Sequence, residues 1–268
     1  MEIIEKRITL ENTEKPLVII PLGDVHYGNI NVDLVKFKET IEYIRTKENC
    51  YAILMGDMCE AIIMSDKRFD IESVTPELRS RVGDLTFGQY ENMRDMLMPI
   101  KHKILLSIRG NHGDNLRLKY NTDFDAWMCK ELGIPMAGYS AFLKLKLDRI
   151  QFHTETLTFF VHHGIMSSRM TGAKVNAVER LAESFIADIY LNGHSHDLFW
   201  TSRVQLSAAG AHLKENRRYF AHTGTFLKTY VEGTMGYGEK ALYPPLKTGV
   251  LKFSIYPKRG HLDIHVSG

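Results

Sequence analysis

Cysteine and long apolar runs are scarce in this 268-residue sequence, and both absences narrow the class of protein. The three cysteines, Cys50, Cys59 and Cys129, form no C-x-x-C pair. Their odd number and their spacing argue against a disulfide framework and against a cysteine zinc site. No stretch of about 18 apolar residues occurs, and the N-terminus lacks a basic segment followed by an apolar one. We therefore expect a cytoplasmic protein with no membrane association.

An excess of charge of either sign is also missing. Lys plus Arg number 34 against 32 for Asp plus Glu, which gives a net charge of +2 and argues against a general polyanion-binding protein. With 44% hydrophobic and 25% charged residues, the composition is that of an ordinary globular protein with a substantial core. No linker, repeat or low-complexity segment interrupts it, so we expect a single domain over residues 1–268. Twelve histidines stand out against this neutral background.

Short apolar runs alternate along the chain with amphipathic segments. Runs that end at or near glycine predict buried strands at 17–20, 51–55, 104–108, 157–161 and 188–191. Apolar residues at helical spacing predict helices at 34–44, 125–132 and 175–185, and a further helix that begins at Pro76 and continues to Ile100. Strict alternation predicts a strand at 143–147 and a C-terminal hairpin over 251–266, with its turn at 258–260. Together these patterns indicate an α/β fold with some antiparallel strands.

Five of the predicted strands run into loops that carry metal-binding side chains. The loops are Gly23–His26, Gly56–Asp57, Gly110–His112, His162–Gly164 and Gly193–His196. Because the carboxyl ends of strands in an open α/β sheet form a ligand crevice, these loops are expected to converge. Carboxylates, imidazoles and one amide, without thiolates, suit Mn²⁺, Fe²⁺ or Zn²⁺. The set exceeds what one tetrahedral ion needs and points to a two-metal site.

In their order along the chain, these blocks resemble the calcineurin-like metallophosphoesterase family. Its pattern D-x-H, G-D, G-N-H, histidine near glycine and G-H-x-H occurs here over roughly residues 17–200. The resemblance implies an α/β fold with a four-layer α/β/β/α sandwich, in which two mixed sheets are flanked by helices. It also implies a hydrolase that acts on phosphoesters.

The resemblance further implies which side chains bind the ions, with Mn²⁺ expected first and Fe or Zn as alternatives. It assigns Asp24, His26 and His196 to one ion, Asn111, His163 and His194 to the other, and Asp57 to both as a bridge. His162 is an alternative to its neighbour His163, because members of the family differ at this block.

Two further residues are implied as catalytic. His112, which follows Asn111, resembles the histidine that donates a proton or hydrogen bond to the leaving oxygen. Glu60 lies where one branch of the family has a carboxylate that orients this histidine. Gly113 and Ala61 depart from the protein-phosphatase pattern, so a typical Ser/Thr protein phosphatase is not expected.

Three more residues are candidates for contact with the substrate. Arg109 precedes the G-N-H block and could contact phosphate or form a structural salt bridge. Thr223 and Thr225 flank Gly224 in a segment that resembles one bordering the substrate in the family. We expect selectivity to reside in the loops at 61–86 and 197–248. A basic cluster at Lys214, Arg217 and Arg218 is read as a solvated face, with nucleic-acid contact as the alternative.

The expected reaction is phosphoester hydrolysis by a hydroxide that bridges two divalent ions. Phosphomonoesters and phosphodiesters, including nucleotides and nucleic acids, remain open as substrates. The alternative is a non-catalytic, metal-binding scaffold with the same fold. That alternative predicts the loss of metal ligands, and in this sequence every block of the pattern is present.

Overall fold

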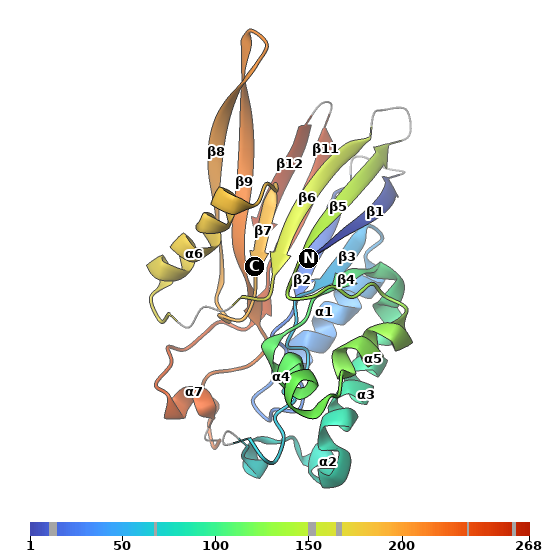
Figure 1. Cartoon of the computed structure of the whole chain (residues 1–268), viewed down its shortest axis with the longest axis vertical. Coiled ribbons are helices and arrows are strands. Elements are labelled where there is room, and N and C mark those ends of the chain that lie inside the picture. Colours follow the sequence, from blue (N-terminus) through green and yellow to red (C-terminus); the bar gives the residue numbers. More distant parts are fainter. Residues whose placement is uncertain (11–14, 67–68, 150–153, 165–167, 235, 259–260) are drawn as a thin grey trace.

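Two β-sheets lie at the centre of the computed structural model, which describes residues 1–268 except 11–14, 67–68, 150–153, 165–167, 235 and 259–260 (Figure 1). Within the described residues, one sheet has seven strands: β1 (Glu2–Leu10), β5 (Ser140–Arg149), β6 (Glu155–His162), β7 (Ile189–Asn192), β9 (His212–Thr225) and β10 (Gly249–Val250) in that order, with β8 (Leu198–Ala209) paired to β9. The other has five: β12 (His261–Ser267), β11 (Lys252–Lys258), β2 (Leu17–Leu22), β3 (Cys50–Leu54) and β4 (Ile104–Ser107). Both sheets are mixed, since parallel pairs such as β2–β3 and β6–β7 adjoin antiparallel pairs such as β2–β11 and β5–β6.

Helices connect these strands and cover the outer faces of both sheets. The described α-helices are α1 (Leu34–Thr46), α2 (Pro76–Arg79), α3 (Leu85–Leu97), α4 (Asn111–Tyr120), α5 (Phe124–Leu132), α6 (Thr171–Ser184) and α7 (Tyr237–Lys240). Short 3-10 helices occupy Ile71–Ser73, Val82–Asp84 and Met98–Lys103.

Three layers of apolar contact separate the four structural layers. Between the sheets, Ile53 and Leu106 of the five-stranded sheet belong to the same buried cluster as Phe159 and Leu191 of the seven-stranded sheet. A second cluster, which includes Phe37 of α1, joins the outer face of the five-stranded sheet to α1, α3 and α5. A third joins the seven-stranded sheet to α6. The predicted four-layer α/β/β/α sandwich is therefore confirmed.

Local sequence explains several of these elements. All six residues of β2 are buried, as expected of a strand covered on both faces. Helix α1 buries Phe37, Ile41 and Ile44 on one side, and the carboxylate of Asp33 accepts a hydrogen bond from the backbone N–H of Lys36 at its start. Burial of the strand and packing of the helix fix the positions of the carboxyl ends of the central strands, and the candidate site lies at these ends.

The predicted helix from Pro76 to Ile100 is wrong as a continuous element. Helix α2 ends at Arg79, a 3-10 turn follows, and α3 runs only from Leu85 to Leu97. Gly83 weakens helix formation at the first break, and Pro99 lies in the 3-10 helix that follows α3. The apolar residues do recur at helical spacing, but the backbone changes direction between α2 and α3.

The segment 197–248, expected as a loop, contains the long hairpin of β8 and β9 and the short helix α7. Strand β1 was also missed. The predicted C-terminal hairpin is present as β11 and β12, which pair from Lys252–Ser267 to Lys258–His261, while residues 259–260 of its turn lie outside the described residues. All three cysteines are free and buried. Within the described part of the chain, no helix has the length and apolar character needed to cross a membrane.

Candidate metal centre

The metal-binding side chains predicted from the sequence meet where strands of both sheets end. Asp24 and Asp57 follow β2 and β3, and Asn111 begins α4 after β4. From the facing sheet, His163 follows β6, and His194 with His196 follow β7. Each sheet therefore supplies part of the cluster, although its members span about 170 positions of the chain.

Asp24, His26 and His196 form the first group, with ligand atoms within 4.8 Å of one another. The Nε2 atoms of His26 and His196 lie 3.0 Å apart, and Nε2 of His196 lies 3.6 Å from Oδ1 of Asp24. Asp24 is fully buried and His26 nearly so. Two imidazole nitrogens and one carboxylate oxygen thus face a common point.

Asp57, His163 and His194 form the second group. Nε2 of His163 lies 3.2 Å from Oδ2 of Asp57 and 3.0 Å from Oδ1 of Asn111. The two groups are neighbours, because the backbone N–H of His194 donates to Oδ2 of Asp24 at 2.9 Å. The structure therefore brings together all seven residues that the sequence singled out for metal.

His162, the alternative to His163, lies outside both groups. Its Nδ1 accepts a hydrogen bond from the backbone N–H of Gly164. His163, in contrast, is fully buried and makes a 2.8 Å contact from Nδ1 to the backbone oxygen of Met55. The geometry favours His163 as the ligand of this block.

Glu60 contacts a different histidine from the one expected. Its carboxylate lies 3.0 Å from Nδ1 of His26, so Glu60 orients a candidate metal ligand. His112 is held instead by a contact from its Nδ1 to the backbone oxygen of Glu60, while its backbone N–H donates to Oδ1 of Asp57. The hydrogen-bond contact of His112 is thus with the main chain of Glu60. One carboxylate oxygen of Glu60 also lies within 4.8 Å of a ring nitrogen of His112, so its predicted orienting role stays a prediction.

The three substrate candidates are engaged in structural contacts. Both terminal nitrogens of Arg109 lie 2.8 Å from the carboxylate oxygens of Asp123, so the salt-bridge alternative holds for this residue. Thr223 and Thr225 are almost completely buried. Oγ1 of Thr225 donates to the backbone oxygen of Asp24 at 2.7 Å and so supports the loop that carries this carboxylate.

Five of the seven candidate ligands have left-handed backbone conformations. The φ angles are 47° at Asp24, 54° at His26, 46° at Asp57, 64° at His194 and 60° at His196. Such angles are uncommon for residues with a side chain and store strain that the surrounding structure must hold. Their concentration in one cluster is typical of a functional site.

Glycine permits the loops to approach one another. A Cβ atom on Gly110 would lie 2.1 Å from Oδ1 of Asp57 and 2.2 Å from its backbone nitrogen. Gly56, at φ 87°, would place a Cβ 2.8 Å from Nδ1 of His163. These two positions explain why the strand-end motifs contain glycine.

Burial and neighbouring charges shift the pKa values within the cluster. Burial raises the pKa of Asp24 to about 6. Burial would also raise the pKa of Asp57, but the adjacent His163 and His112 outweigh it and hold the pKa well below its usual range. His163, buried beside Asp57, has a pKa raised to about 9 because the carboxylate stabilises its charged form. Burial and the charge of His163 lower the pKa of His194 to about 4.

The donor set fits divalent cations. Oδ1 of Asp24 is buried and has no hydrogen-bond partner within the described part of the chain. With Nδ1–H of His163 directed at the oxygen of Met55, its Nε2 faces two oxygen acceptors, and the raised pKa of His163 means that a proton on Nε2 joins them in the metal-free chain. A divalent cation would take the place of that proton and would also partner Oδ1 of Asp24, because buried carboxylates and imidazole nitrogens bind divalent metals through these atoms.

A buried polar network behind the site was not anticipated from the sequence. Oγ of Ser195, which lies between His194 and His196, contacts Nδ1 of His222, and Nε2 of His222 lies 3.3 Å from the backbone oxygen of Lys174. Burial lowers the pKa of His222 to about 4, so its ring is neutral and accepts the hydroxyl hydrogen of Ser195. The signal in the sequence was His222 itself, a histidine placed directly after the apolar run at 219–221 and before Thr223.

Comparisons with known proteins give similarity in structure only. No family model and no curated protein matches the sequence. The solved structures that match include zinc-complexed Vps29 from Entamoeba histolytica, 11% identical over 93% of this chain and 98% of that one, with a TM-score of 0.37. A predicted phosphoesterase from Streptococcus pneumoniae TIGR4 is 13% identical over 93% and 88%, with a TM-score of 0.35. A metallophosphoesterase from Sphaerobacter thermophilus is 12% identical over 94% and 88%, with a TM-score of 0.39. Two of these three structures are described as phosphoesterases.

Proposed function

We propose that the chain is a metal-dependent phosphoesterase. The observation that carries the proposal is the pair of adjacent ligand groups on strained loops. They surround a buried carboxylate oxygen that has no hydrogen-bond partner among the residues described by the structure. Asp24, His26 and His196 would hold one ion, and Asn111, His163 and His194 the other. Asp57 would contact both. Divalent ions in this site, Mn²⁺ first and Fe or Zn as alternatives, would supply positive charge for the phosphoryl oxygens and lower the pKa of water.

His112 is proposed to assist departure of the alcohol. Its Nδ1 is directed at the backbone oxygen of Glu60, which leaves Nε2 as the atom that can carry a proton to the leaving oxygen. The backbone N–H of His112 donates to Asp57, so the histidine is fixed relative to the metal ligands. These two contacts support the proposal that His112 donates a proton beside the site and is not one of the seven ligands.

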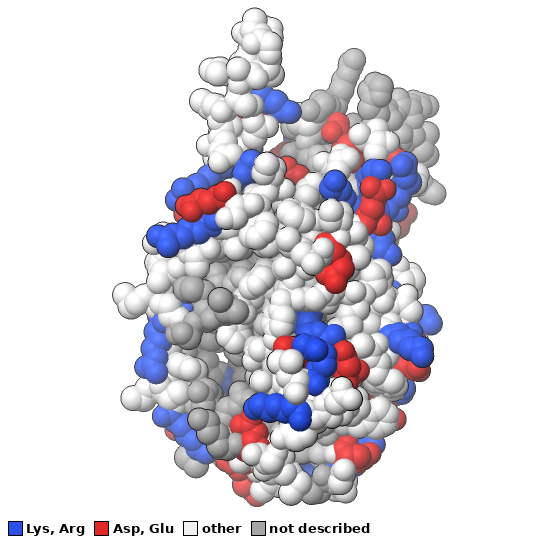
Figure 2. Space-filling view, viewed as in Figure 1, with Lys and Arg blue, Asp and Glu red and all other residues white. Residues whose placement is uncertain are grey.

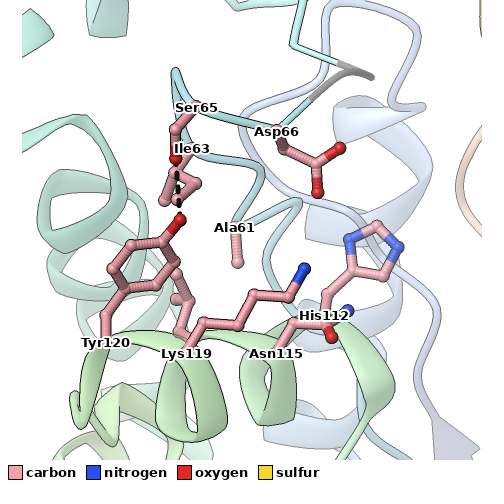
Figure 3. Close-up of a pocket in the computed structure, with 9 residues that line it drawn as sticks. Ala61, Ile63, Ser65, Asp66, His112, Asn115, Lys119 and Tyr120 are labelled. Atoms are coloured by element: carbon pink, nitrogen blue, oxygen red, sulfur yellow. Dashed lines mark hydrogen bonds between the residues drawn. The ribbon is translucent and has the colours of Figure 1, made fainter.

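A pocket of about 500 Å³ adjoins His112 and is proposed to receive the leaving group (Figure 3). Asn115, Lys119 and Tyr120 of α4 form one wall. The other wall is formed by Ala61, Ile63, Ser65 and Asp66. Tyr120 and Ser65 close the far end through a 2.7 Å hydrogen bond between their hydroxyls. The volume lies in the range of small-molecule sites, which suits a nucleoside-sized alcohol. We therefore include phosphodiesters and nucleotides among the proposed substrates.

The test is hydrolysis by the manganese-loaded protein. The substrates are p-nitrophenyl phosphate, bis-p-nitrophenyl phosphate, cyclic nucleotides, single-stranded DNA and RNA. We expect turnover of at least one of them, and we expect His112→Ala to retain its metal while losing about 10²- to 10⁴-fold in kcat. The matched control is His102→Ala, which removes an exposed histidine outside the cluster and should leave kcat unchanged.

Two results would contradict the proposal. Wild-type turnover in His112→Ala would remove the assigned role of His112. A protein that binds metal but hydrolyses none of these substrates would favour the non-catalytic scaffold instead. Elemental analysis of the same samples separates loss of metal from loss of chemistry.

A further inference from the structure

The loop at residues 193–197 carries one candidate ligand of each metal group. His194 belongs to the second group and His196 to the first, so this short loop joins the two halves of the centre. Both histidines have left-handed backbones, with φ angles of 64° and 60°. Such conformations cost free energy in residues with a side chain and persist only where the surrounding structure holds them. The contacts that hold this loop therefore bear on both groups.

Ser195, the residue between the two histidines, fixes the middle of the loop through its side chain. Its Oγ contacts Nδ1 of His222. His222 is fully buried in β9, where it pairs with Asn192 at the end of β7. Its ring stacks on that of Phe199, with the ring centroids 4.7 Å apart. The serine is thus attached to a side chain that the sheet and the stacked ring hold in place.

Helix α6 sets the polarity of this contact from the other side of the ring. Nε2 of His222 lies 3.3 Å from the backbone oxygen of Lys174. A carbonyl oxygen only accepts hydrogen bonds, so Nε2 carries the proton of the neutral ring. Nδ1 then presents a lone pair, and the hydroxyl of Ser195 donates to it.

The same helix holds the end of the loop through a buried ion pair. Nζ of Lys174 contacts Oδ2 of Asp197, the residue that follows His196. Lys and Arg lie beside Asp or Glu at many places on the visible surface (Figure 2), whereas the side chain of Lys174 is only 7% exposed. A buried charge persists only where it is paired. Helix α6 therefore supports the loop at two points, through His222 and through Asp197.

We propose that His222, acting through Ser195, is a positioning residue for both metal ions. This inference rests on the proposed function in taking His194 and His196 as ligands. The hydrogen bond to His222 fixes the backbone between the two imidazoles. Its loss would leave both rings free to move away from the points at which their groups converge.

Two other supports of the candidate ligands act on one group each. The carboxylate of Glu60 contacts His26 of the first group. The backbone oxygen of Met55 contacts His163 of the second. A change at Ser195 should therefore weaken two ions, whereas a change in the Glu60 carboxylate should weaken one. A residue that served stability alone would weaken neither selectively.

The first test is a calorimetric titration of the metal-free, full-length protein with MnCl₂, fitted for two sites. Ser195→Ala removes the hydrogen-bond donor, and we expect both dissociation constants to rise about 10- to 100-fold, as when a residue that orients a metal ligand is lost. Glu60→Gln should raise one constant. The matched control is Ser207→Ala, which removes the acceptor of a hydrogen bond from Asn216 in an exposed part of β8 and should change neither. A rise in one constant or in neither for Ser195→Ala would overturn the proposal.

The second test removes the same bond from the other side. His222→Phe keeps an aromatic ring but deletes the acceptor, so both constants should again rise, and this variant decides the question if Ser195→Ala does not fold. Adding Ser195→Ala to His222→Phe should cost no further affinity, because the two residues act through one contact. Ser195→Thr keeps the hydroxyl and should bind both ions as the wild type does. Multiplied losses in the double variant, or a loss in Ser195→Thr equal to that in Ser195→Ala, would overturn the proposal.

A third measurement needs no metal. Nitrogen-15 NMR of the metal-free protein should show His222 protonated at Nε2, and Ser195→Ala should shift the resonance of Nδ1. A proton on Nδ1 would overturn the proposal.

The inference and the proposed function can fail separately, because the readout is metal affinity and not turnover. A wild-type protein that binds two Mn²⁺ but hydrolyses no phosphoester would contradict the proposed function, while the variants would still decide the role of His222. A wild-type protein that binds no Mn²⁺ would overturn both.

Discussion

The strand-end loops at the metal centre differ in backbone, burial and polarity from residues 203–218 of the β8–β9 hairpin, here called the arm. In the loops, Asp24, Asp57 and His194 have φ angles of 47°, 46° and 64°, and the two carboxylates are buried. In the arm the backbone is regular, its turn is made with Gly210 at φ 62°, and Leu206 and Leu213 are exposed. The loops thus combine conformational strain with buried polar groups, whereas the arm exposes apolar groups on unstrained strands.

This difference indicates where each region is stabilised. Packing between the two sheets must hold the strained loops, because buried charged groups and left-handed residues both carry a free-energy cost. In the arm the free-energy cost of backbone strain and of buried charge is low, but little packing stabilises it. Changes in the loops should therefore affect metal binding and stability together, whereas changes in the arm should lower stability only slightly and leave metal binding unchanged.

The largest effect is expected from Asp57→Asn. This change removes one charge from the proposed bridging position, and we expect loss of bound metal and of at least about 10³-fold in activity. Metal content by elemental analysis and hydrolysis of bis-p-nitrophenyl phosphate measure the two effects. Asp95→Asn, on the exposed side of α3, is the matched control. Retention of two metals per chain in Asp57→Asn would refute the bridging assignment.

A smaller but still clear effect is expected from Gly110→Ala. The added Cβ would meet Oδ1 and the backbone nitrogen of Asp57, so the loops must separate. We expect a loss of about 1–3 kcal/mol in the free energy of unfolding, together with weaker metal binding. Urea denaturation and metal titration measure these. Unchanged metal affinity would show that the close approach of the loops is not needed for the site.

Asp125, next to the strand-end loops, should make stability depend on pH. Burial raises the pKa of Asp125 to about 7, with Tyr90 donating to Oδ1 at 3.0 Å and Oδ2 without a hydrogen-bond partner in the described part of the chain. The folded pKa lies above the unfolded value of about 3.9, so the stabilisation is complete below that value and is lost as pH rises towards about 7. The metal-free protein should lose about 1.4 kcal/mol per pH unit over this range relative to Asp125→Asn. If the free energies of unfolding of the wild type and of Asp125→Asn changed in parallel with pH, this prediction would be wrong.

The smallest effect is expected from Gly210→Ala in the arm. Open space surrounds this position, so the cost is limited to the left-handed conformation, about 1 kcal/mol. Activity and metal content should equal those of the wild type. Gly110→Ala and Gly210→Ala add the same methyl group, one in the loops and one in the arm, so a comparison of the two variants tests whether the regions are independent. A loss of metal from Gly210→Ala would show that they are coupled.

The sequence located the candidate site well because its chemistry resides in rare residue types. Asp24, His26 and the other five ligand candidates were found from their place after short apolar strands. The contact of the Glu60 carboxylate with His26 could not be predicted from the sequence, because the side chain and the main-chain oxygen of this residue contact different histidines. The sequence around Arg109 could not distinguish a contact with phosphate from the ion pair with Asp123, because both depend on which groups the fold brings next to this side chain.

The fold was predictable where local pattern and burial agree, as in β2, β3 and α1. Strands β8 and β9 were missed because nothing near them in the chain buries their outer halves. Their formation depends on pairing with each other and, at the base, with β7. The break after α2 was missed because apolar spacing records which side of a segment is buried and not whether its axis continues.

The division of the ligand candidates between two sheets has a consequence for distant core positions. Asp24, Asp57 and Asn111 are anchored in one sheet, and His163 and His194 in the other, with Leu106 and Phe159 among the side chains that separate the sheets. The thickness of that apolar filling sets how far apart the two halves of the centre stand. The interior of the sandwich therefore acts as a spacer, so a change in the volume of a core side chain should alter the geometry of the candidate metal centre from a distance.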